Sequence, residues 1–135
     1  MAVSRRPRRT GATAVPRAPR KPGGVVAIIV AAGRGERLGG ETPKALVELA
    51  GRSMLRRSAE ALAACAEVNA LVVVAPSGFE RIAGDEVFGT GKLRAVVAGG
   101  ATRQDSVRAG LARTTDRDSV VLVHDAARPF VDAEV

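Results

Sequence analysis

The sequence predicts an α/β protein with an open, mainly parallel sheet between two layers of helices. Short apolar runs alternate with segments of helical period from Val25 onward, a rhythm that is typical of successive βαβ units. The runs at 25–30 and 120–123 are apolar without alternation, as expected of strands that are buried on both faces. Of the 135 residues, 46% are hydrophobic, which is ample for one packed domain.

The elements are expected in a regular order. Residues 25–31 should form the first strand, and a Gly-rich loop follows it. Ser53 is placed to cap a helix that runs to Cys65, because the apolar residues of that segment share one stripe. Cys65 at its end should be small core filler. The remaining elements are a strand from Asn69 to Ala75, a helical turn at 79–82, a strand at 93–98, a helix at 102–112 and a strand at 119–124.

The first 24 residues differ in composition from the rest. Seven of the 21 basic residues and none of the 14 acidic residues lie there, so residues 25–135 hold 14 of each and are formally neutral. The segment mixes Arg with Pro, Ala and Gly and has no apolar period, which predicts a disordered extension outside the fold. A nucleic-acid contact is therefore expected only as non-specific binding through this tail, the alternatives being a solvated extension or an organellar, for example plastid, transit peptide.

Other classes of protein are disfavoured by simple counts. No apolar run approaches the roughly 20 residues of a membrane span, and no signal-peptide core follows Arg5 and Arg6. A single cysteine excludes a disulfide framework and a thiolate metal cluster. These features indicate the cytoplasm or a similarly reducing compartment. The sequence ends where another helix is expected, which suggests a truncated chain that would be poorly soluble or inactive alone.

The loop after the first strand has the chemistry of a phosphate site. Its small residues let backbone N–H groups approach phosphates, while Arg37 and Lys44 bring two cations to the carboxyl edge of the sheet. A dinucleotide fingerprint would need Gly in place of Leu38, and the Gly-Lys-Ser/Thr ending of a P-loop is absent. The alternative is a Gly-rich turn with solvated charges.

Two further motifs follow later strands. Gly100 permits close approach of a ligand, and Ser106 lies on the first turn of the next helix, where a hydroxyl can read a base edge. The alternative is local capping by Thr102 and Ser106.

Asp125 ends an otherwise apolar strand and is suited to hold Mg²⁺ through its oxygens. His124 is either a metal ligand or, as is more common for a His that flanks such an acid, a hydrogen-bonded structural residue. Arg128 is either an anion contact or an ion-pair partner.

Together, the segments AAGRGERL with TPK, GGATRQDSV and VLVHDAARPF resemble the methylerythritol-phosphate cytidylyltransferase family of the non-mevalonate isoprenoid pathway. The resemblance runs from Val25 to the end. It implies a Rossmann-like nucleotidyltransferase fold over 25–135, a Mg²⁺ cofactor, a homodimer, and transfer of CMP from CTP to 2-C-methyl-D-erythritol 4-phosphate. By matching positions it implies the following roles: cytidine binding by Ala31, Ala32, Gly33, Gly100 and Ser106; catalysis by Arg37 and Lys44; Mg²⁺ binding by Asp125; and a polyol-phosphate contact by Arg128.

The sequence also departs from the family pattern. Val30 stands where many members have Pro, and the dimer arm, later substrate-binding residues and a second catalytic Lys would follow Val135. The nearest rival is the related ribitol-phosphate cytidylyltransferase. An inactive nucleotide-binding fragment is the second alternative.

Overall fold

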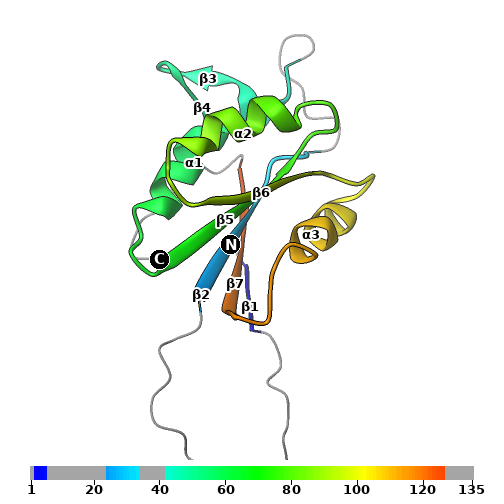
Figure 1. Cartoon of the computed structure of the whole chain (residues 1–135). Coiled ribbons are helices and arrows are strands. Elements are labelled where there is room, and N and C mark those ends of the chain that lie inside the picture. Colours follow the sequence, from blue (N-terminus) through cyan, green and yellow to red (C-terminus); the bar gives the residue numbers. More distant parts are fainter. Residues whose placement is uncertain (1, 6–23, 34–41, 127–135) are drawn as a thin grey trace, which may run out of the picture.

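The computed structural model describes residues 2–5, 24–33 and 42–126. In these segments a five-stranded sheet has the order β1-β7-β2-β5-β6. Strands β2 (Gly24–Val30), β5 (Val68–Ala75), β6 (Leu93–Ala98) and β7 (Asp118–Asp125) are parallel to one another. Their bounds agree with the expected strands to within one residue, so the mainly parallel sheet is confirmed (Figure 1).

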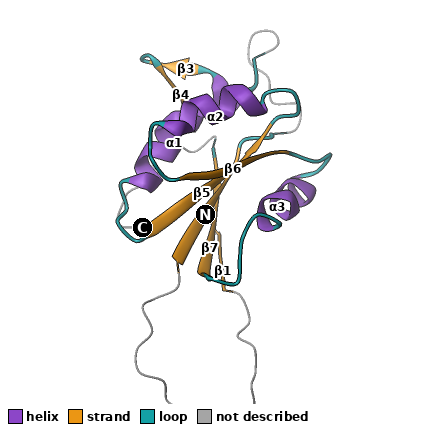
Figure 2. Cartoon of the chain, viewed as in Figure 1, coloured by secondary structure: helices purple, strands orange, loops and turns teal. Residues whose placement is uncertain are grey.

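Helices cover both faces of this sheet, as the three-layer prediction requires (Figure 2). Helices α1 (Met54–Ala63) and α2 (Glu80–Phe88) lie on one face, and α3 (Arg103–Leu111) lies on the other. Alternate residues of β2 and β5 therefore point into two separate cores. Ala27, Ile29 and Val73 pack in the cluster with α1, whereas Ile28 and Val74 pack in the cluster beneath α3.

Helix starts follow the capping rules that the sequence indicated. The hydroxyl of Ser53 accepts from the backbone N–H of Arg56 at 3.0 Å, and that of Thr102 accepts from Asp105 N–H at 3.0 Å. Each bond satisfies one of the N–H groups that a helix leaves unpaired at its first turn. Helix α2 is longer than the expected turn at 79–82. Its buried residues are only Ala83 and Val87, one turn apart, so the sequence carries only a weak apolar period for this helix.

The segment between β2 and α1 contains three short elements that the sequence did not predict. A 3₁₀ turn, η1 (Lys44–Leu46), is followed by a hairpin of β3 (Glu48–Leu49) and β4 (Arg52–Ser53). The hairpin turn consists of Ala50 and Gly51, with φ of 54° and 80°. Positive φ at both central residues is the geometry of a tight hairpin turn, for which Asn-Gly is the usual sequence. Ala at the first position hides that signal.

The expectation that residues 1–24 stay outside the fold is wrong at both ends of this segment. Strand β1 (Ala2–Arg5) pairs antiparallel with β7, from Ala2 opposite Val123 to Arg5 opposite Val120, and Gly24 already belongs to β2. Without β1 the outer edge of β7 would present unpaired backbone groups in the described part of the chain. Residues 6–23 lie outside the described residues.

At the amino ends of the strands, an ion pair joins β6 to β7 across two intervening strands. Arg94 donates to both carboxylate oxygens of Asp118, at 2.8 and 3.1 Å, and Thr115 N–H donates at 2.7 Å. Asp118 is 3% exposed. Burial raises the pKa of this carboxyl, but the hydrogen bonds from Arg94 and Thr115 and the Arg94 charge outweigh burial and hold the pKa below its usual range.

We expect Asp118→Asn to lower the free energy of unfolding by about 1–3 kcal/mol at pH 7, since Arg94 loses its charged acceptor. A carboxyl whose pKa is lower in the folded state than in the unfolded state stabilises the fold at pH values above its unfolded pKa of about 4. That stabilisation is lost as the pH falls through the folded-state pKa. The variant should therefore lose less stability than the wild type on acidification below about pH 4. Urea titrations from pH 7 to 3 measure both effects, with the exposed Asp85→Asn as control; equal pH dependence of wild type and Asp118→Asn would refute the assignment.

Helix α3 packs closely on the sheet at Gly110. A Cβ at this position would lie 2.6 Å from Ile28 Cγ2 and 3.0 Å from Val74 Cγ2. Gly110→Ala should therefore lower the free energy of unfolding by about 1–3 kcal/mol, because overpacking forces the helix off the sheet. Gly89→Ala is the control, since a Cβ there meets nothing within 4 Å. A Gly110→Ala protein as stable as this control in urea would show that the contact relaxes without cost.

Candidate active site

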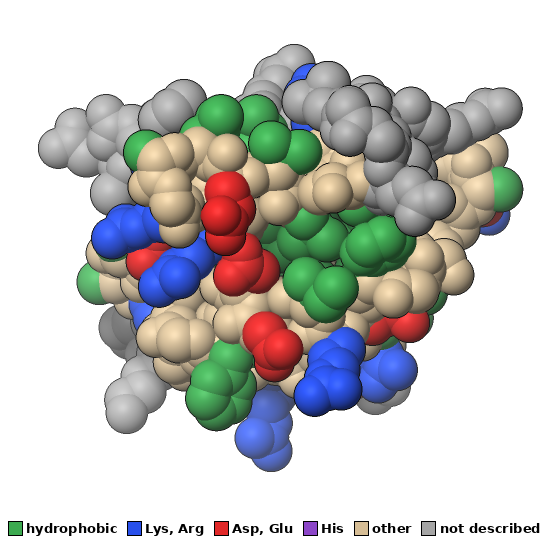
Figure 3. Space-filling model, turned by 90° about the horizontal axis from the view of Figure 1, so that it is seen from above, with side chains coloured by type: hydrophobic (Ala, Val, Ile, Leu, Met, Phe, Trp, Pro, Cys, Tyr) green, Lys and Arg blue, Asp and Glu red, His purple; other side chains and the backbone are tan. Residues whose placement is uncertain are grey.

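The loops that follow β2, β5 and β6 meet at the carboxyl edge of the sheet, where open α/β sheets bind ligands. Backbone hydrogen bonds hold them in register: Ala31 N–H donates to Val74 O at 2.8 Å, and Gly99 N–H donates to Ala75 O at 2.8 Å. Figure 3 views the molecule from this end and shows a group of hydrophobic side chains near the middle with charged side chains of both signs around it.

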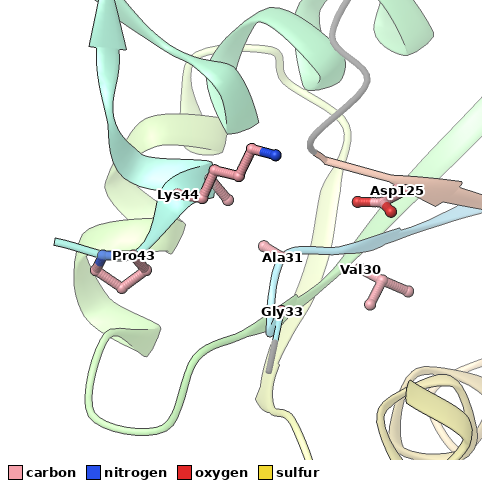
Figure 4. A pocket seen from close by; sticks show the side chains of 7 residues that line it. Val30, Ala31, Gly33, Pro43, Lys44 and Asp125 are labelled. Atoms are coloured by element: carbon pink, nitrogen blue, oxygen red, sulfur yellow. The ribbon is translucent and has the colours of Figure 1, made fainter. Parts of the chain in front are cut away.

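A pocket at this edge brings together two of the charged residues that the sequence singled out. It is lined by the following residues: Val30, Ala31, Gly33, Pro43, Lys44, Ala45 and Asp125. In Figure 4 the Lys44 amine and the Asp125 carboxylate extend toward the same space from opposite walls, with Ala31 between them. The pocket has a volume of only about 10 Å³, room for one water-sized group. A space of this size does not enclose a larger ligand, which would have to lie outside it.

Lys44 is held by local backbone structure. It begins η1, in which Leu46 N–H donates to Pro43 O at 2.9 Å and Val47 N–H donates to Lys44 O at 3.2 Å. The neighbouring Ala45 is buried in the core beside α1. This anchoring leaves the half-buried Lys44 side chain directed to the edge of the sheet (Figure 4).

Asp125 is the last residue of β7 and pairs with Val30 of β2. The next residue, Ala126, is fully buried and donates its N–H to Val30 O at 3.0 Å, so the strand end is fixed immediately beyond the carboxylate. His124 is buried at 1% exposure.

The described segments contain no cluster of three or more His, Cys, Asp or Glu side chains around a common point. A metal at Asp125 would need further oxygens, and nucleotide phosphates supply them in sites that bind Mg²⁺ through one or two carboxylates.

The loop after β6 is crowded. A Cβ on Gly99 would lie 2.2 Å from Ala32 Cβ and 2.8 Å from Ser106 Oγ, and a Cβ on Gly100 would lie 2.4 Å from Asp105 Cβ. Only glycine therefore lets this loop lie against the loop after β2. The two segments that the sequence assigned to cytidine are thus in direct contact.

Ser106 has a local role in this structure. It is fully buried, and its Oγ accepts from Gly100 N–H at 3.1 Å. The N–H groups of Ala31, Gly99 and Gly100 are all used within the protein. These three N–H groups are therefore already occupied in this conformation.

Gly99→Ala should lower the free energy of unfolding by about 1–3 kcal/mol, because the added methyl must displace Ala32 or Ser106. Urea titrations measure this, with Gly89→Ala again as the control. A Gly99→Ala protein as stable as this control would show that the two loops separate without cost.

Two of the candidate residues, Arg37 and Arg128, lie outside the described residues. Of the rest, the structure gathers Ala31, Gly33, Lys44 and Asp125 around one pocket and places Ala32 against the Gly99 loop. Ser58 of α1, which contacts the end of β7, was missed by the sequence analysis. Its position within the apolar stripe of α1 was the available signal, because a polar residue at a core position needs a hydrogen-bond partner.

This three-layer fold, with a cation and a carboxylate at the carboxyl edge of a parallel sheet, is that of a nucleotidyltransferase domain. The chain belongs to the family described as IspD, 2-C-methyl-D-erythritol 4-phosphate cytidylyltransferase, whose model matches residues 25–135. The resemblance carried by the three motifs and the nucleotidyltransferase fold are both confirmed.

Individual relatives agree with this assignment. A 2-C-methyl-D-erythritol 4-phosphate cytidylyltransferase of Frankia casuarinae is 50% identical over 115 residues, covering 82% of this chain and 41% of the relative. A bifunctional enzyme IspD/IspF of Anaeromyxobacter sp. is 53% identical over 106 residues, covering 78% and 27%. The solved 4-diphosphocytidyl-2C-methyl-D-erythritol synthase of Anaerococcus prevotii is 29% identical with a TM-score of 0.69, covering 82% and 46%. The chain thus spans less than half the length of these relatives.

In the described segments, no helix is both long enough and apolar enough to cross a membrane.

Proposed function

We propose that this chain is the nucleotide-binding part of an enzyme that transfers CMP from CTP to 2-C-methyl-D-erythritol 4-phosphate. The products are 4-diphosphocytidyl-2-C-methyl-D-erythritol and pyrophosphate. The observation that carries this proposal is the convergence of Lys44 and Asp125 on one pocket beside Ala31 and Gly33. Family membership supplies the identity of the two substrates.

The reaction is a displacement at phosphorus. An oxygen of the acceptor phosphate attacks the α-phosphorus of CTP; as that bond forms, the bond from this phosphorus to the oxygen bridging to the β-phosphate breaks, and pyrophosphate leaves. The acceptor phosphate is already ionised near neutral pH, so the attacking atom needs no general base. Catalysis then depends on positioning two anions and on neutralising their charge.

We assign Lys44 to the phosphates of CTP. Its ammonium is a compact positive charge that can follow the phosphate oxygens as charge shifts toward the leaving pyrophosphate. Arg37, by its position in the phosphate loop of the sequence, is assigned the same task. Arg128 is assigned to the acceptor phosphate from the family resemblance.

We assign Asp125 to a divalent cation, Mg²⁺, in company with phosphate oxygens of CTP. A carboxylate at the edge of a small pocket fits this role, since Mg²⁺ prefers oxygen ligands and retains several waters. Bound Mg²⁺ would neutralise phosphate charge. Asp125 would keep its oxygens directed into the pocket because the Ala126 to Val30 hydrogen bond fixes the end of β7.

Cytidine is assigned to the two glycine loops, with Ala31, Ala32 and Gly33 on one side and Gly100 and Ser106 on the other. Cytosine presents an amino group where uracil presents an oxygen, and a backbone carbonyl accepts from the former only. Carbonyls of Ala31 and Gly100 would thus favour CTP over UTP. This assignment is consistent with the N–H groups of both residues, which already donate hydrogen bonds within the protein. Homodimer formation and a cytoplasmic location complete the proposal.

The test is a pyrophosphate-release assay with paired acceptors, methylerythritol phosphate and ribitol phosphate. It uses the 135-residue chain and a chimera that joins residues 25–135 to the part of the Frankia casuarinae relative that follows the matched region. Turnover of the chimera with CTP and methylerythritol phosphate is the expected result. Preference for ribitol phosphate would refute the acceptor, and CTP binding without turnover of either would indicate a nucleotide-binding fragment.

A further inference from the structure

Two consecutive residues of helix α1 hydrogen-bond to the segments that follow the two charged residues of the pocket. One wall carries Lys44 on η1, and the other carries Asp125 at the end of β7. Arg57 hydrogen-bonds to Leu49, in the hairpin that follows η1, and Ser58 hydrogen-bonds to Ala126, the residue after Asp125. The two walls belong to parts of the chain that are more than 80 residues apart, and one helical turn joins them.

The contact of Ser58 is with the segment that immediately follows Asp125. Ser58 is fully buried, and its hydroxyl donates to the carbonyl oxygen of Ala126 at 3.3 Å. Ala126 is also fully buried, so water is not available to replace this donor. The N–H of Ala126 donates to Val30 O, which means that both backbone groups of this residue are fixed. Loss of the Ser58 hydroxyl leaves a buried carbonyl oxygen to find another partner, and the strand end must shift to do so.

The contact of Arg57 is with the hairpin that follows Lys44. Its guanidinium donates from Nη2 to the carbonyl oxygen of Leu49 in β3. A backbone bond from Met54 N–H to Val47 O at 3.2 Å lies beside it. Arg57 Nε is buried with no hydrogen-bond partner in the described part of the chain, so this side chain bears a desolvation cost that a surface arginine avoids.

We propose that Arg57 and Ser58 are positioning residues. Their two hydrogen bonds, here called the tie, hold the hairpin that follows Lys44 and the residue that follows Asp125 on the same turn of α1, and so set the separation of Lys44 and Asp125. The role in nucleotide binding rests on the function proposed above. The tie itself does not, because both hydrogen bonds form within the protein and involve no nucleotide. Neither side chain need touch the nucleotide.

Amide hydrogen exchange by NMR on the 135-residue chain tests the tie without any ligand. Ser58→Ala should speed exchange of the Ala126 amide about five- to tenfold, the factor that corresponds to loss of one ordinary hydrogen bond. Arg57→Met should do the same for the amide of Val47, which donates to Lys44 O. The controls are Leu62→Val, a small loss on the buried face of α1, and Arg56→Met, which removes an exposed arginine from the same helix.

Calorimetric binding of two probes then tests the consequence for the site. Both variants should raise the Kd of CTP with Mg²⁺ about fivefold and leave the Kd of cytidine unchanged, because cytidine has no phosphates to meet Lys44 and Asp125. The two controls should change neither Kd by more than about twofold.

Each outcome decides one part of the proposal. Exchange rates in Ser58→Ala and Arg57→Met that match their controls would overturn the tie. Faster exchange together with an unchanged Kd for CTP with Mg²⁺ would overturn the role in the site. A wild-type chain that binds no CTP would instead refute the proposed function, and the exchange rates would still decide whether the tie exists.

Discussion

Lys44→Met is expected to lower kcat about 10²- to 10³-fold, equivalent to about 3–4 kcal/mol, with a much smaller change in the Kd of CTP. The ammonium faces the pocket in which the phosphates would lie (Figure 4). Charge on the bridging oxygen grows only as the bond to the α-phosphorus breaks, so a contact with that oxygen acts mainly on the transition state. Single-turnover rates and CTP titrations of the chimera described above separate the two effects.

The control for this variant is Arg81→Met, which removes an exposed cation on α2. It should leave kcat within about twofold of wild type, since surface changes away from a site have small effects. If Lys44→Met raised the Kd of CTP as much as it lowered kcat/KM, Lys44 would serve ground-state binding only. A normal kcat would remove Lys44 from the reaction altogether.

Most of the sheet could be predicted because its strands are buried on both faces. The run from Val26 to Val30 is fully or almost fully buried, as is Leu71 to Ala75, so each reads as an apolar segment without alternation. Ser53 and Thr102 could be predicted as caps because their signal is local, a hydroxyl followed three residues later by the N–H it accepts.

The features that were missed depend on partners far away in the sequence or on unusual backbone geometry. Arg94 meets Asp118 and Ser58 meets Ala126 only after the sheet has formed, at separations of 24 and 68 residues. Strand β1 has four residues, too few for a periodic pattern, and it forms on the free edge of β7. The β3–β4 hairpin is turned by Ala50 at a φ of 54°, which its residue type disfavours.

Part of the candidate site could also be predicted, from the positions of its residues relative to the strands. Asp125 ends β7, Ala31 directly follows β2, and Lys44 lies in the segment that connects β2 to α1; the carboxyl ends of parallel strands meet at one edge of the sheet. Their convergence follows from the fold class. The use of the Gly100 N–H by Ser106 does not, because it depends on the path of one loop. Thus the sequence predicted that Ala31, Lys44 and Asp125 lie at one edge of the sheet, whereas the structure was needed to show that the N–H groups of Ala31 and Gly100 donate within the protein.

Asp125→Asn is expected to lower turnover of the chimera about 10²-fold at low magnesium and to recover about tenfold at high magnesium. The amide keeps the shape of the side chain and one oxygen, so β7 and the Ala126 to Val30 hydrogen bond should remain. What it removes is the negative charge that helps to hold Mg²⁺, and a weaker site is filled again by mass action.

Magnesium titrations of turnover and of CTP affinity, for Asp125→Asn and for the exposed control Asp85→Asn, measure this effect. Recovery at high magnesium confined to Asp125→Asn is the expected result, because Asp85 lies on α2 and outside the pocket lining. An Asp125→Asn enzyme that is strongly impaired at every magnesium concentration would change the assignment of Asp125 from metal ligand to substrate contact. Near-normal turnover at low magnesium would remove Asp125 from the reaction, and the proposed site would then lose the carboxylate wall on which its metal chemistry depends.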